Sequence, residues 1–499
     1  MAGKRNYLLL AAAALLLAAA GCRSAYTPEN QRELAGLYYG GDVSKAAEYA
    51  SAISEDEKDE TTLHALLWHL EAGNVNLDAG KYRESQRCLE RAEKLLYLFD
   101  GGTQRFHTPG ASTYRGTRSD RILLHLLKGF NYLEDGKLED FLVEIRRLRA
   151  EQFRYVLDEA DPGVRSYEAV NAGRAGVTPW AMREIVDKAG DKNRIFRASG
   201  LYDGYTEYSQ RRRPQLPLLY NPLAFYLSAL GYVFDNEYEE ALIDFRYLLM
   251  LDPKNPLYRQ DCAALIRALG DGVPDTLKDA PRGTVPDDQV VCFIVGRGRP
   301  DAWQSCKRIY TLPGKVPTDW SFSFPDYHPW RDPGFSVRCG SGPGAVGTHL
   351  ADLSEIANEE YWQSVFPGMV DRAYKATVAM TVAHESAKAS LAAALAMPNN
   401  DYKRLAVASA SLAVAATSRA VVTELEWRRW VTLPRSYSIA HVRLPEPGSS
   451  RKMTLAVNTG SGQTKEFELD FAPETNRAVI YLRELGDGDF VLKKWESEE

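Results

Sequence analysis

The sequence has 499 residues, more than one ordinary core accommodates, so we expect two or three folded units joined by linkers. Its 61 basic and 67 acidic residues give a formal net charge of -6, which argues against the basic surface of a nucleic-acid-binding protein. A hydrophobic content of 45%, with 11% aromatic residues, is typical of a chain that folds over most of its length.

The first 21 residues have the pattern of a signal peptide. Lys4 and Arg5 form a basic start, an apolar run follows over residues 7–20, and small residues precede Cys22. The apolar run is short for a transmembrane span, so cleavage and export are expected instead of membrane spanning.

The residues Ala19-Ala20-Gly21 before Cys22 resemble a lipobox, although Ala19 stands where that motif usually has Leu. The resemblance implies cleavage before Cys22, lipidation of its thiol and a stable membrane anchor. Because Arg23 follows, and not the Asp of an inner-membrane retention signal, we expect the outer membrane, with the chain facing the periplasm. The alternative is a plain secretory signal.

Three segments in the N-terminal half share a grid of small and large residues. They comprise Gly73, Gly80, Tyr82, Ser85, Leu89 and Ala92, then Gly129, Tyr132, Gly136, Leu138, Phe141, Ile145 and Leu148, then Ala229, Tyr232, Tyr238, Ala241, Phe245, Leu248 and Pro253. A small residue lets two helices approach and a large one fills the complementary gap, which predicts helical hairpins. The alternative is a set of ordinary amphipathic helices.

These intervals resemble the tetratricopeptide repeat, most clearly in the third segment. The resemblance implies a helical-repeat domain over residues 22–270, made irregular by insertions within 100–118 and 161–220. The residues proposed for repeat packing and partner binding are Gly73, Tyr82, Gly129, Tyr132, Tyr232, Ala241 and Phe245.

A linker is predicted over residues 271–289, where Gly, Pro and Asp are frequent, and a mixed α/β domain over 290–499. Strands are expected near 290–312 and 436–495, where apolar runs and alternating patterns occur. Residues 351–426 read as a long helical hairpin. We expect the two strand regions to share a small antiparallel sheet, with the hairpin inserted between them.

Two features of this half leave alternatives open. The alanine-rich stretch from Leu405 to Val422 carries one charged residue, so a membrane hairpin competes with a packed helix pair, although charges elsewhere in the hairpin disfavour the membrane. Cys292 and Cys306 either form a disulfide or remain small buried thiols.

No catalytic constellation, metal site or cofactor motif emerges, so we expect a protein that is not an enzyme. His384-Glu385 begins like a zinc-protease motif but has Lys388 where a second His is needed. His64 and His69 are five positions apart, a poor chelating spacing on a helix. Glu144, beside two arginines, is predicted to lie on a solvated helix face.

Several stretches resemble a family of bacterial lipoproteins that carry tetratricopeptide-like repeats and have no known reaction. The matching stretches are Leu66-Leu67-Trp68-His69-Leu70-Glu71-Ala72-Gly73, Tyr114-Arg115-Gly116 with Asp120-Arg121, Val143-Glu144-Ile145-Arg146-Arg147, Asn221-Pro222-Leu223-Ala224 and Trp430-Val431-Thr432-Leu433-Pro434. Members are often encoded beside small lipoproteins that look like activators of penicillin-binding proteins. The resemblance therefore implies a part in cell-envelope assembly.

The sequence thus predicts a lipid-anchored scaffold that binds an envelope protein through its helical repeats. The alternative is glycan or lipid binding by the aromatic-rich segment 320–335, because stacked aromatic rings suit sugars, with a role in peptidoglycan or outer-membrane assembly. An envelope hydrolase with an unrecognised site is a third hypothesis.

Overall fold

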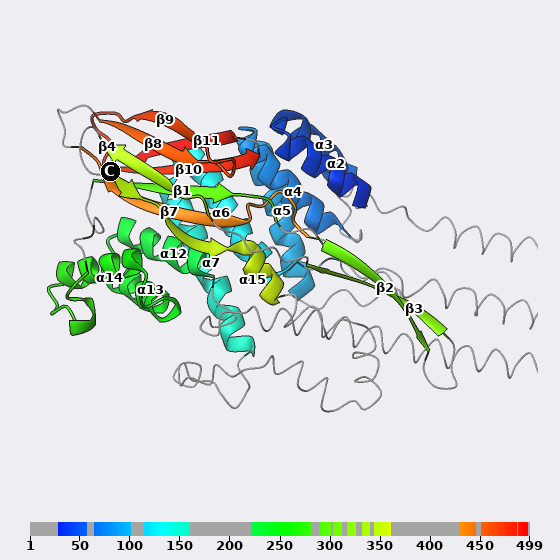
Figure 1. The fold of residues 1–499 in the computed structure, drawn as a ribbon, viewed down its shortest axis with the longest axis horizontal. Helices are drawn as coiled ribbons and strands as arrows, with labels where there is room; N and C mark the ends of the chain where they lie inside the picture. The colour runs from blue at the N-terminus through cyan, green and yellow to red at the C-terminus, as the bar shows by residue number, and fades with distance from the viewer. Residues whose placement is uncertain are drawn as a thin grey trace, which may run out of the picture.

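The computed structural model places helical hairpins beside two layers of strands (Figure 1). The residues that it describes are 28–56, 64–100, 114, 116–159, 221–280, 283, 289–300, 303–311, 317–325, 332–339, 344–360, 429–445, 451–486 and 488–497. Cys22 and the whole signal peptide lie outside these residues, as do both insertions of the repeat domain for most of their length.

Four pairs of helices follow one another in the N-terminal half, and one further helix completes the series. The pairs are α2 (Pro28–Tyr39) with α3 (Val43–Asp56), α4 (Ala65–Asp78) with α5 (Tyr82–Asp100), α6 (Arg118–Glu134) with α7 (Leu138–Glu159), and α12 (Pro222–Phe234) with α13 (Tyr238–Leu251), before α14 (Pro256–Ala268). Each helix contacts its hairpin partner, and α5 contacts α6 as α7 contacts α12. The chain is therefore mainly α, with irregular tetratricopeptide-like repeats, as predicted.

Side-chain caps fix where the helices α6, α12 and α14 begin. Thr117 and Asp120 form a capping box at α6, each accepting a hydrogen bond from the other's backbone N–H. Asn221 and Asn255 each accept a hydrogen bond from the backbone N–H two residues on, just before a proline that opens the helix. These signals recur at the same place in successive units.

The turn inside each helical hairpin contains one residue with a left-handed backbone. It is Gly41, Gly80, Gly136 or Asn236, with φ between 60° and 85°. In each turn the next residue's N–H bonds to a carbonyl five residues back, as from Lys137 to Tyr132, which closes the helix end with a Schellman motif. The hairpins therefore turn in one way despite their different sequences.

The two predicted strand regions pair in a five-stranded sheet. Its order is β11 (Asp489–Ser497), β10 (Arg477–Gly486), β1 (Val290–Arg297), β7 (Ser436–Arg443) and β6 (Thr348–Asp352). The prediction of a shared sheet is confirmed for strands from both regions, although residues 303–311, 452–458 and 464–470 pair outside it. Neighbouring strands are antiparallel except for β1 and β10, which run parallel. A long connection between β1 and β10 makes that parallel pairing feasible.

A second sheet has the order β5 (Ala345–Val346), β4 (Phe335–Cys339), β8 (Lys452–Asn458) and β9 (Thr464–Asp470). The fully buried strand β1 joins the layers because its side chains alternate. Val291, Phe293 and Val295 pack in the core with the second sheet, whereas Cys292 and Ile294 pack in the core shared with the helices. The molecule therefore has three layers: helices, five-stranded sheet and four-stranded sheet.

Four described elements belong to neither of these sheets nor to the helical pairs. A two-stranded ribbon, β2 (Trp303–Thr311) and β3 (Pro317–Pro325), precedes the predicted helical hairpin in the sequence. The helix α15 (Leu353–Glu360) corresponds to the first residues of that hairpin. The short helix η1 (Asp275–Leu277) lies in the predicted linker. Residues 361–428, which hold most of the hairpin and the membrane alternative, lie outside the described residues. No described helix is long and apolar enough to span a membrane.

Cys292 is a free, buried thiol between the sheet and the helices, so the alternative of a disulfide with Cys306 is wrong. Its side chain points from β1 into the core that the sheet shares with the helices. Burial also raises the pKa of this thiol well above its usual range, which keeps it protonated and inert.

Candidate functional site

Gly73 and Gly129 mark the closest approaches within two helical hairpins. A Cβ atom added at Gly73 would lie 2.5 Å from Leu89 Cδ2, and one at Gly129 would lie 3.0 Å from Phe141 Cδ2. No side chain larger than hydrogen fits the first position without displacing Leu89. The structure therefore brings these two predicted repeat residues to the contact between the helices of a pair.

The third unit presents its predicted residues to the interior. Ala241 and Phe245 on α13 are fully buried. Tyr232 on α12 accepts a 2.9 Å hydrogen bond from Arg149 Nη1 of the preceding repeat, and the guanidinium lies over its ring. These three residues join helices of the repeat array to one another.

The other two predicted tyrosines are half-buried and also bond within the molecule. The hydroxyl of Tyr82 on α5 accepts a 2.8 Å hydrogen bond from Lys493 Nζ on β11. The hydroxyl of Tyr132 on α6 accepts a 3.1 Å hydrogen bond from Gln86 Nε2 on α5. Tyr82 thus joins a repeat to the sheet, and Tyr132 joins two repeats.

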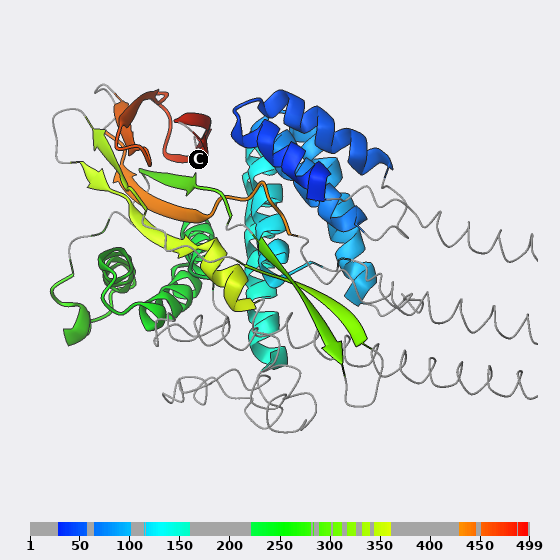
Figure 2. The same ribbon diagram turned by 45° about the vertical axis from the view of Figure 1, so that its right-hand side comes forward.

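The helical layer lies beside the five-stranded sheet (Figure 2), where α2 contacts β10, α12 contacts β6, and α6 packs against β10 and β11. Phe130 of α6 lies 5.1 Å from the Trp495 ring and 4.9 Å from the Tyr481 ring, centroid to centroid. Further along, Tyr226 of α12 lies 5.5 Å from the ring of His441 on β7. Because α2, α4, α6 and α12 would form the inner groove of such a repeat array, the protein's own strands fill that groove.

An extended stretch of the chain, residues 429–435, lies against α2 and α4 in the same groove; we call it the clamped segment. The Glu71 carboxylate accepts hydrogen bonds from Val431 N (2.6 Å), Thr432 N (3.2 Å) and Thr432 Oγ1 (2.6 Å). Asn74, one turn along α4, donates to Thr432 O at 3.0 Å. The repeat thus binds this segment mainly through its backbone.

Tyr39 and Arg483 also form hydrogen bonds with the clamped segment. The Tyr39 hydroxyl lies 2.9 Å from both the Val431 and the Leu433 carbonyl oxygens. Arg483 of β10 donates to the Tyr39 hydroxyl at 3.0 Å and to the Thr432 carbonyl at 3.3 Å. Helix, extended segment and sheet therefore meet in one hydrogen-bonded network.

Burial dominates the electrostatics of this network. Burial raises the pKa of Glu71 from 4.5 to about 8, although the hydrogen bonds from Thr432 and Val431 oppose this. Burial likewise raises the pKa of Tyr39 to about 12, against the nearby charge of Arg483. Glu71 is fully buried, so its carboxyl group is closed to water.

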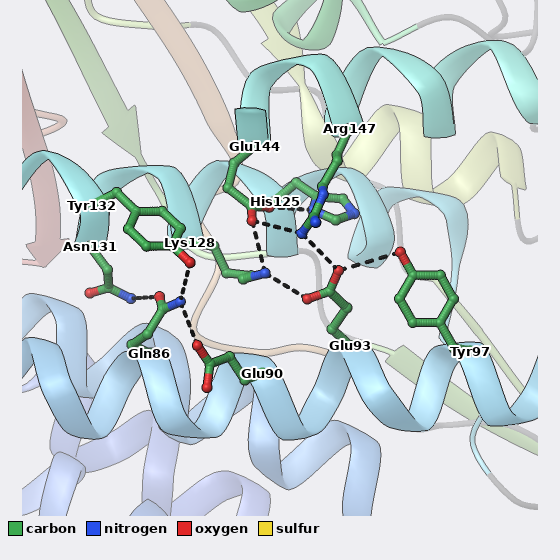
Figure 3. Close-up of polar contacts among 10 residues, drawn as sticks. All are labelled: Gln86, Glu90, Glu93, Tyr97, His125, Lys128, Asn131, Tyr132, Glu144 and Arg147. Carbon is green, nitrogen blue, oxygen red and sulfur yellow. Dashed lines mark hydrogen bonds and ion pairs between the residues drawn. The ribbon is translucent and has the colours of Figure 1, made fainter. Parts of the chain in front are cut away.

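A second polar cluster lies where α5, α6 and α7 meet (Figure 3). Lys128 Nζ of α6 contacts Glu93 Oε2 at 2.5 Å and Glu144 Oε1 at 2.9 Å. The other oxygen of Glu144 lies 2.7 Å from His125 Nδ1. Lys128 and Glu144 are both buried, so three helices are joined by a buried ion-pair network.

The prediction that Glu144 lies on a solvated face is wrong. Its side chain is 2% exposed, whereas the side chain of Arg147 is 47% exposed and reaches back to both Glu144 (3.0 Å) and Glu93 (3.4 Å). Position 144 belongs to the buried stripe of α7, and Lys128 and His125 from the facing helix compensate its charge. Sequence neighbours on one helix gave no sign of these partners.

Two opposing effects set the pKa values in this cluster. Burial raises the pKa of Glu144, but hydrogen bonds from His125 and Lys128 outweigh burial and hold the pKa below its usual value. Burial lowers the pKa of Lys128, but hydrogen bonds to Glu93 and Glu144 outweigh it and raise the pKa. Both groups therefore stay charged at neutral pH.

The second helix of each pair lies on the outside of the array and carries exposed apolar side chains. Tyr97 on α5 is 55% exposed, Val143 on α7 40% and Ile243 on α13 39%. Tyr97 lies beside the ion-pair network, since its hydroxyl donates to Glu93 (Figure 3). Among the described helices, the large apolar side chains that remain exposed therefore lie on this outer face.

Sequence reasoning missed Glu71, Asn74 and Thr432 as a connected set. One signal was present: α4 carries polar residues on every side, and all its residues are buried. A buried carboxylate inside an apolar run requires a partner, but the partner, Thr432, lies 361 residues away. Two of the five stretches that carry the family resemblance, residues 66–73 and 430–434, thus contact each other.

Two of the sequence patterns considered for metal binding or catalysis fall on described residues. The described residues contain no group of three or more His, Cys, Asp or Glu side chains placed to hold a metal ion. His64 and His69 are both buried in the first half of α4 and its approach. The motif at 384–388, and the side chains from Trp320 to Trp330 on which the glycan or lipid alternative rests, lie outside the described residues.

Comparison with protein-family models finds no match, and a search of curated proteins finds none. Among solved structures, the chain is similar to the TPR2AB-domain:pHSP90-complex of yeast Sti1, with 14% sequence identity and a TM-score of 0.18. The aligned part covers 48% of this chain and 83% of that chain. At this TM-score the likeness adds nothing to the helix packing described above.

Proposed function

We propose that this protein is a lipid-anchored scaffold of the bacterial cell envelope that binds another envelope protein through its helical repeats and catalyses no reaction. The observation that carries the proposal is the open outer face of a repeat array whose inner face is already filled. Helical repeats present extended surfaces to proteins, and among the described helices the second helix of a pair carries the exposed apolar residues that such a surface needs. The lipobox resemblance at Cys22 supports the anchor.

The partner surface that we propose is the outer edge of α5 and α7 around Tyr97. Tyr97 is the most exposed large hydrophobic side chain on the described helices, and tyrosine is common among residues that dominate protein interfaces. Behind it, the network of Glu93, Lys128 and Glu144 fixes the two helices relative to each other. A fixed surface binds without a large ordering cost.

Photocrosslinking in intact cells tests this surface. A photoreactive phenylalanine analogue at Tyr97 should crosslink to one defined envelope protein, identified by mass spectrometry. The matched control is the same analogue at Val346, which is 74% exposed on the short strand β5 and does not belong to the helical repeats. Identical products at both positions, or none at Tyr97, would count against the proposed surface.

The anchor is tested separately. Growth with an alkyne-tagged fatty acid should label the wild-type chain, and Cys22→Ser should abolish the label and release the protein from the membrane fraction. Labelling that persists in Cys22→Ser would show that the anchor is elsewhere. Loss of the anchor leaves the repeat surface intact, so the two parts of the proposal fail independently.

A further inference from the structure

The second sheet ends in two edge strands of unequal length. One is β5, which has two residues, and the other is β9, which has seven, Thr464–Asp470. β9 pairs with β8 in one continuous register and contains no proline, and no described strand pairs with its other side. It lies at the outer margin of the strand layers (Figure 1). A regular, open edge of this kind is where a further strand can join a sheet.

The hydrogen bonds at both ends of β9 show which of its backbone groups face outward. Thr459 N–H donates to Gln463 O at 2.7 Å, and Phe471 N–H donates to Arg451 O at 3.1 Å. Because every second residue of an antiparallel strand bonds to its neighbour, the odd-numbered residues of β9 bond to β8. The even-numbered residues therefore point their N–H and C=O groups away from β8: Thr464, Glu466, Glu468 and Asp470.

Lys494 of β11 agrees with this direction at one end of the edge. Its Nζ donates to the Asp470 carbonyl oxygen at 2.7 Å, so that oxygen points away from β8. The backbone groups of Thr464, Glu466 and Glu468 have no hydrogen-bond partner among the residues that the structure describes. Each of the three therefore offers one donor and one acceptor to an incoming strand.

Two exposed carboxylates accompany these open backbone groups. Glu466 and Glu468 lie on the same face of the second sheet, because strand side chains alternate. Their neighbours across β8 are Ala456 and Thr454, which carry no charge. Neither carboxylate forms an ion pair with any described residue. The edge therefore presents two uncompensated negative charges at alternate positions.

A second copy of β9 would fit this edge poorly. Two copies paired antiparallel about Phe467 would place Glu466 of each opposite Glu468 of the other, and like charges directly opposite destabilise a strand pair. A segment with Lys or Arg at alternate positions would instead place a cation opposite each glutamate. Its intervening side chains would lie beside Phe467, whose ring packs on Phe490 with 5.4 Å between centroids, so apolar residues suit those positions.

We propose that β9 binds an extended segment of another protein, with Lys or Arg at alternate positions, which joins the second sheet as a further strand. Backbone hydrogen bonds hold the segment, and the alternating cations supply specificity. The same glutamates keep two copies of the chain from pairing at this edge. The site uses residues of the second sheet, so it depends neither on the anchor nor on the surface around Tyr97.

Peptide binding to the intact chain tests the charge pattern. A fluorescent peptide that alternates lysine and valine over the length of β9 should bind, measured by anisotropy, and its counterpart with glutamate in place of lysine should not. Glu466→Arg combined with Glu468→Arg should weaken binding of the lysine peptide by about tenfold or more and make the glutamate peptide bind. The control Glu474→Arg, at an exposed position after β9, should leave both results unchanged.

A proline tests the backbone pairing. Glu466→Pro removes an N–H that points away from β8, whereas Glu466→Thr loses the same carboxylate and keeps the N–H. With circular dichroism unchanged, proline should weaken binding of the lysine peptide more than threonine does.

Hydrogen exchange of the wild-type chain tests the same pairing without a substitution. The lysine peptide should slow exchange at the N–H groups of Glu466 and Glu468, and should leave Lys465 and Phe467, which already bond to β8, unchanged. No binding by the wild-type chain, equal binding of the two peptides, or unchanged exchange at Glu466 and Glu468 would each overturn the proposal. So would equal binding by the proline and threonine variants.

Discussion

At the scale of single residues, the buried carboxyls of Glu71 and Glu144 reach opposite outcomes. Glu71 receives hydrogen bonds only from uncharged donors, so burial prevails and its pKa rises to about 8. Glu144 accepts hydrogen bonds from His125 and Lys128, which outweigh burial and lower its pKa. The difference lies in the groups supplied by other helices and segments, because both residues sit on buried helix faces.

Glu71 should make the stability of the protein pH-dependent. Between its ordinary pKa of 4.5 and its folded pKa of about 8, the folded state holds a proton that the unfolded state has released. Its contribution is therefore fully present below about pH 4.5 and is lost as pH rises to 8. Glu71→Gln should flatten the fall in the free energy of unfolding between pH 5 and 8, measured by urea denaturation. An unchanged slope, matching the exposed control Glu90→Gln, would contradict this.

Replacing Lys128 alone should lower the free energy of unfolding more than replacing Lys128 together with Glu144. Lys128→Met removes the buried cation from Glu144 and leaves its carboxylate with His125 and the half-exposed Arg147, so we expect a loss of about 3–5 kcal/mol of unfolding free energy. Adding Glu144→Gln should recover a large part of that loss, because the buried charge is then gone. Additive losses in the double variant, measured by chemical denaturation, would refute the network.

At the scale of elements, the hairpin turns show how different sequences give one geometry. Gly41, Gly80 and Gly136 take a left-handed backbone without steric cost because they have no Cβ. Asn236 has φ of 60° at the same place and is the one non-glycine residue with positive φ among those described. Asparagine tolerates this conformation better than most residues, which explains its presence there.

Replacing Asn236 by glycine should therefore increase the stability of the protein. Asn236→Gly removes the left-handed strain at a position where the backbone N–H groups already make the Schellman bonds, so we expect about 0.5–1 kcal/mol of added stability. Asn236→Ala should lose a similar amount. Thermal unfolding of the three proteins checks the order Gly, Asn, Ala, and any other order would show that the asparagine side chain itself stabilises the turn.

At the scale of the whole molecule, the helices and the five-stranded sheet share one core. A continuous cluster of buried residues includes Phe130 of α6, Tyr481 of β10 and Trp495 of β11. The clamped segment, residues 429–435, adds polar bonds between the same layers. Repeat arrays usually depend on neighbouring repeats alone, whereas this one also depends on a sheet formed by the second half of the chain.

The shared core predicts that both layers unfold together. Trp495→Ala should cost about 3–5 kcal/mol, as for a large buried aromatic side chain, and should increase hydrogen exchange in α6 as well as in β10. The control Phe467→Ala lies at the edge of the other sheet and should leave exchange in α6 unchanged. If Trp495→Ala affects only the strands, the repeats fold independently.

Local pattern was enough to find most elements. The alternating patterns within 436–495 predicted the region that holds β7 to β11, and the small residues Gly73 and Gly129 predicted helices in close contact. These signals are local because side-chain period and glycine spacing follow directly from strand and helix geometry. The same reasoning identified the strand regions around 290 and 436 as parts of one sheet.

By itself, then, the sequence determined the kinds of elements, their order and the small residues where helices meet, since each depends on neighbours within a few turns. Only the tertiary structure decided that strands fill the inner face of the repeats, that Glu71 holds residues 431 and 432, and that Glu144 is buried. Those outcomes depend on partners supplied by distant parts of the chain. A buried polar group shows that it needs a partner, but the fold chooses which one.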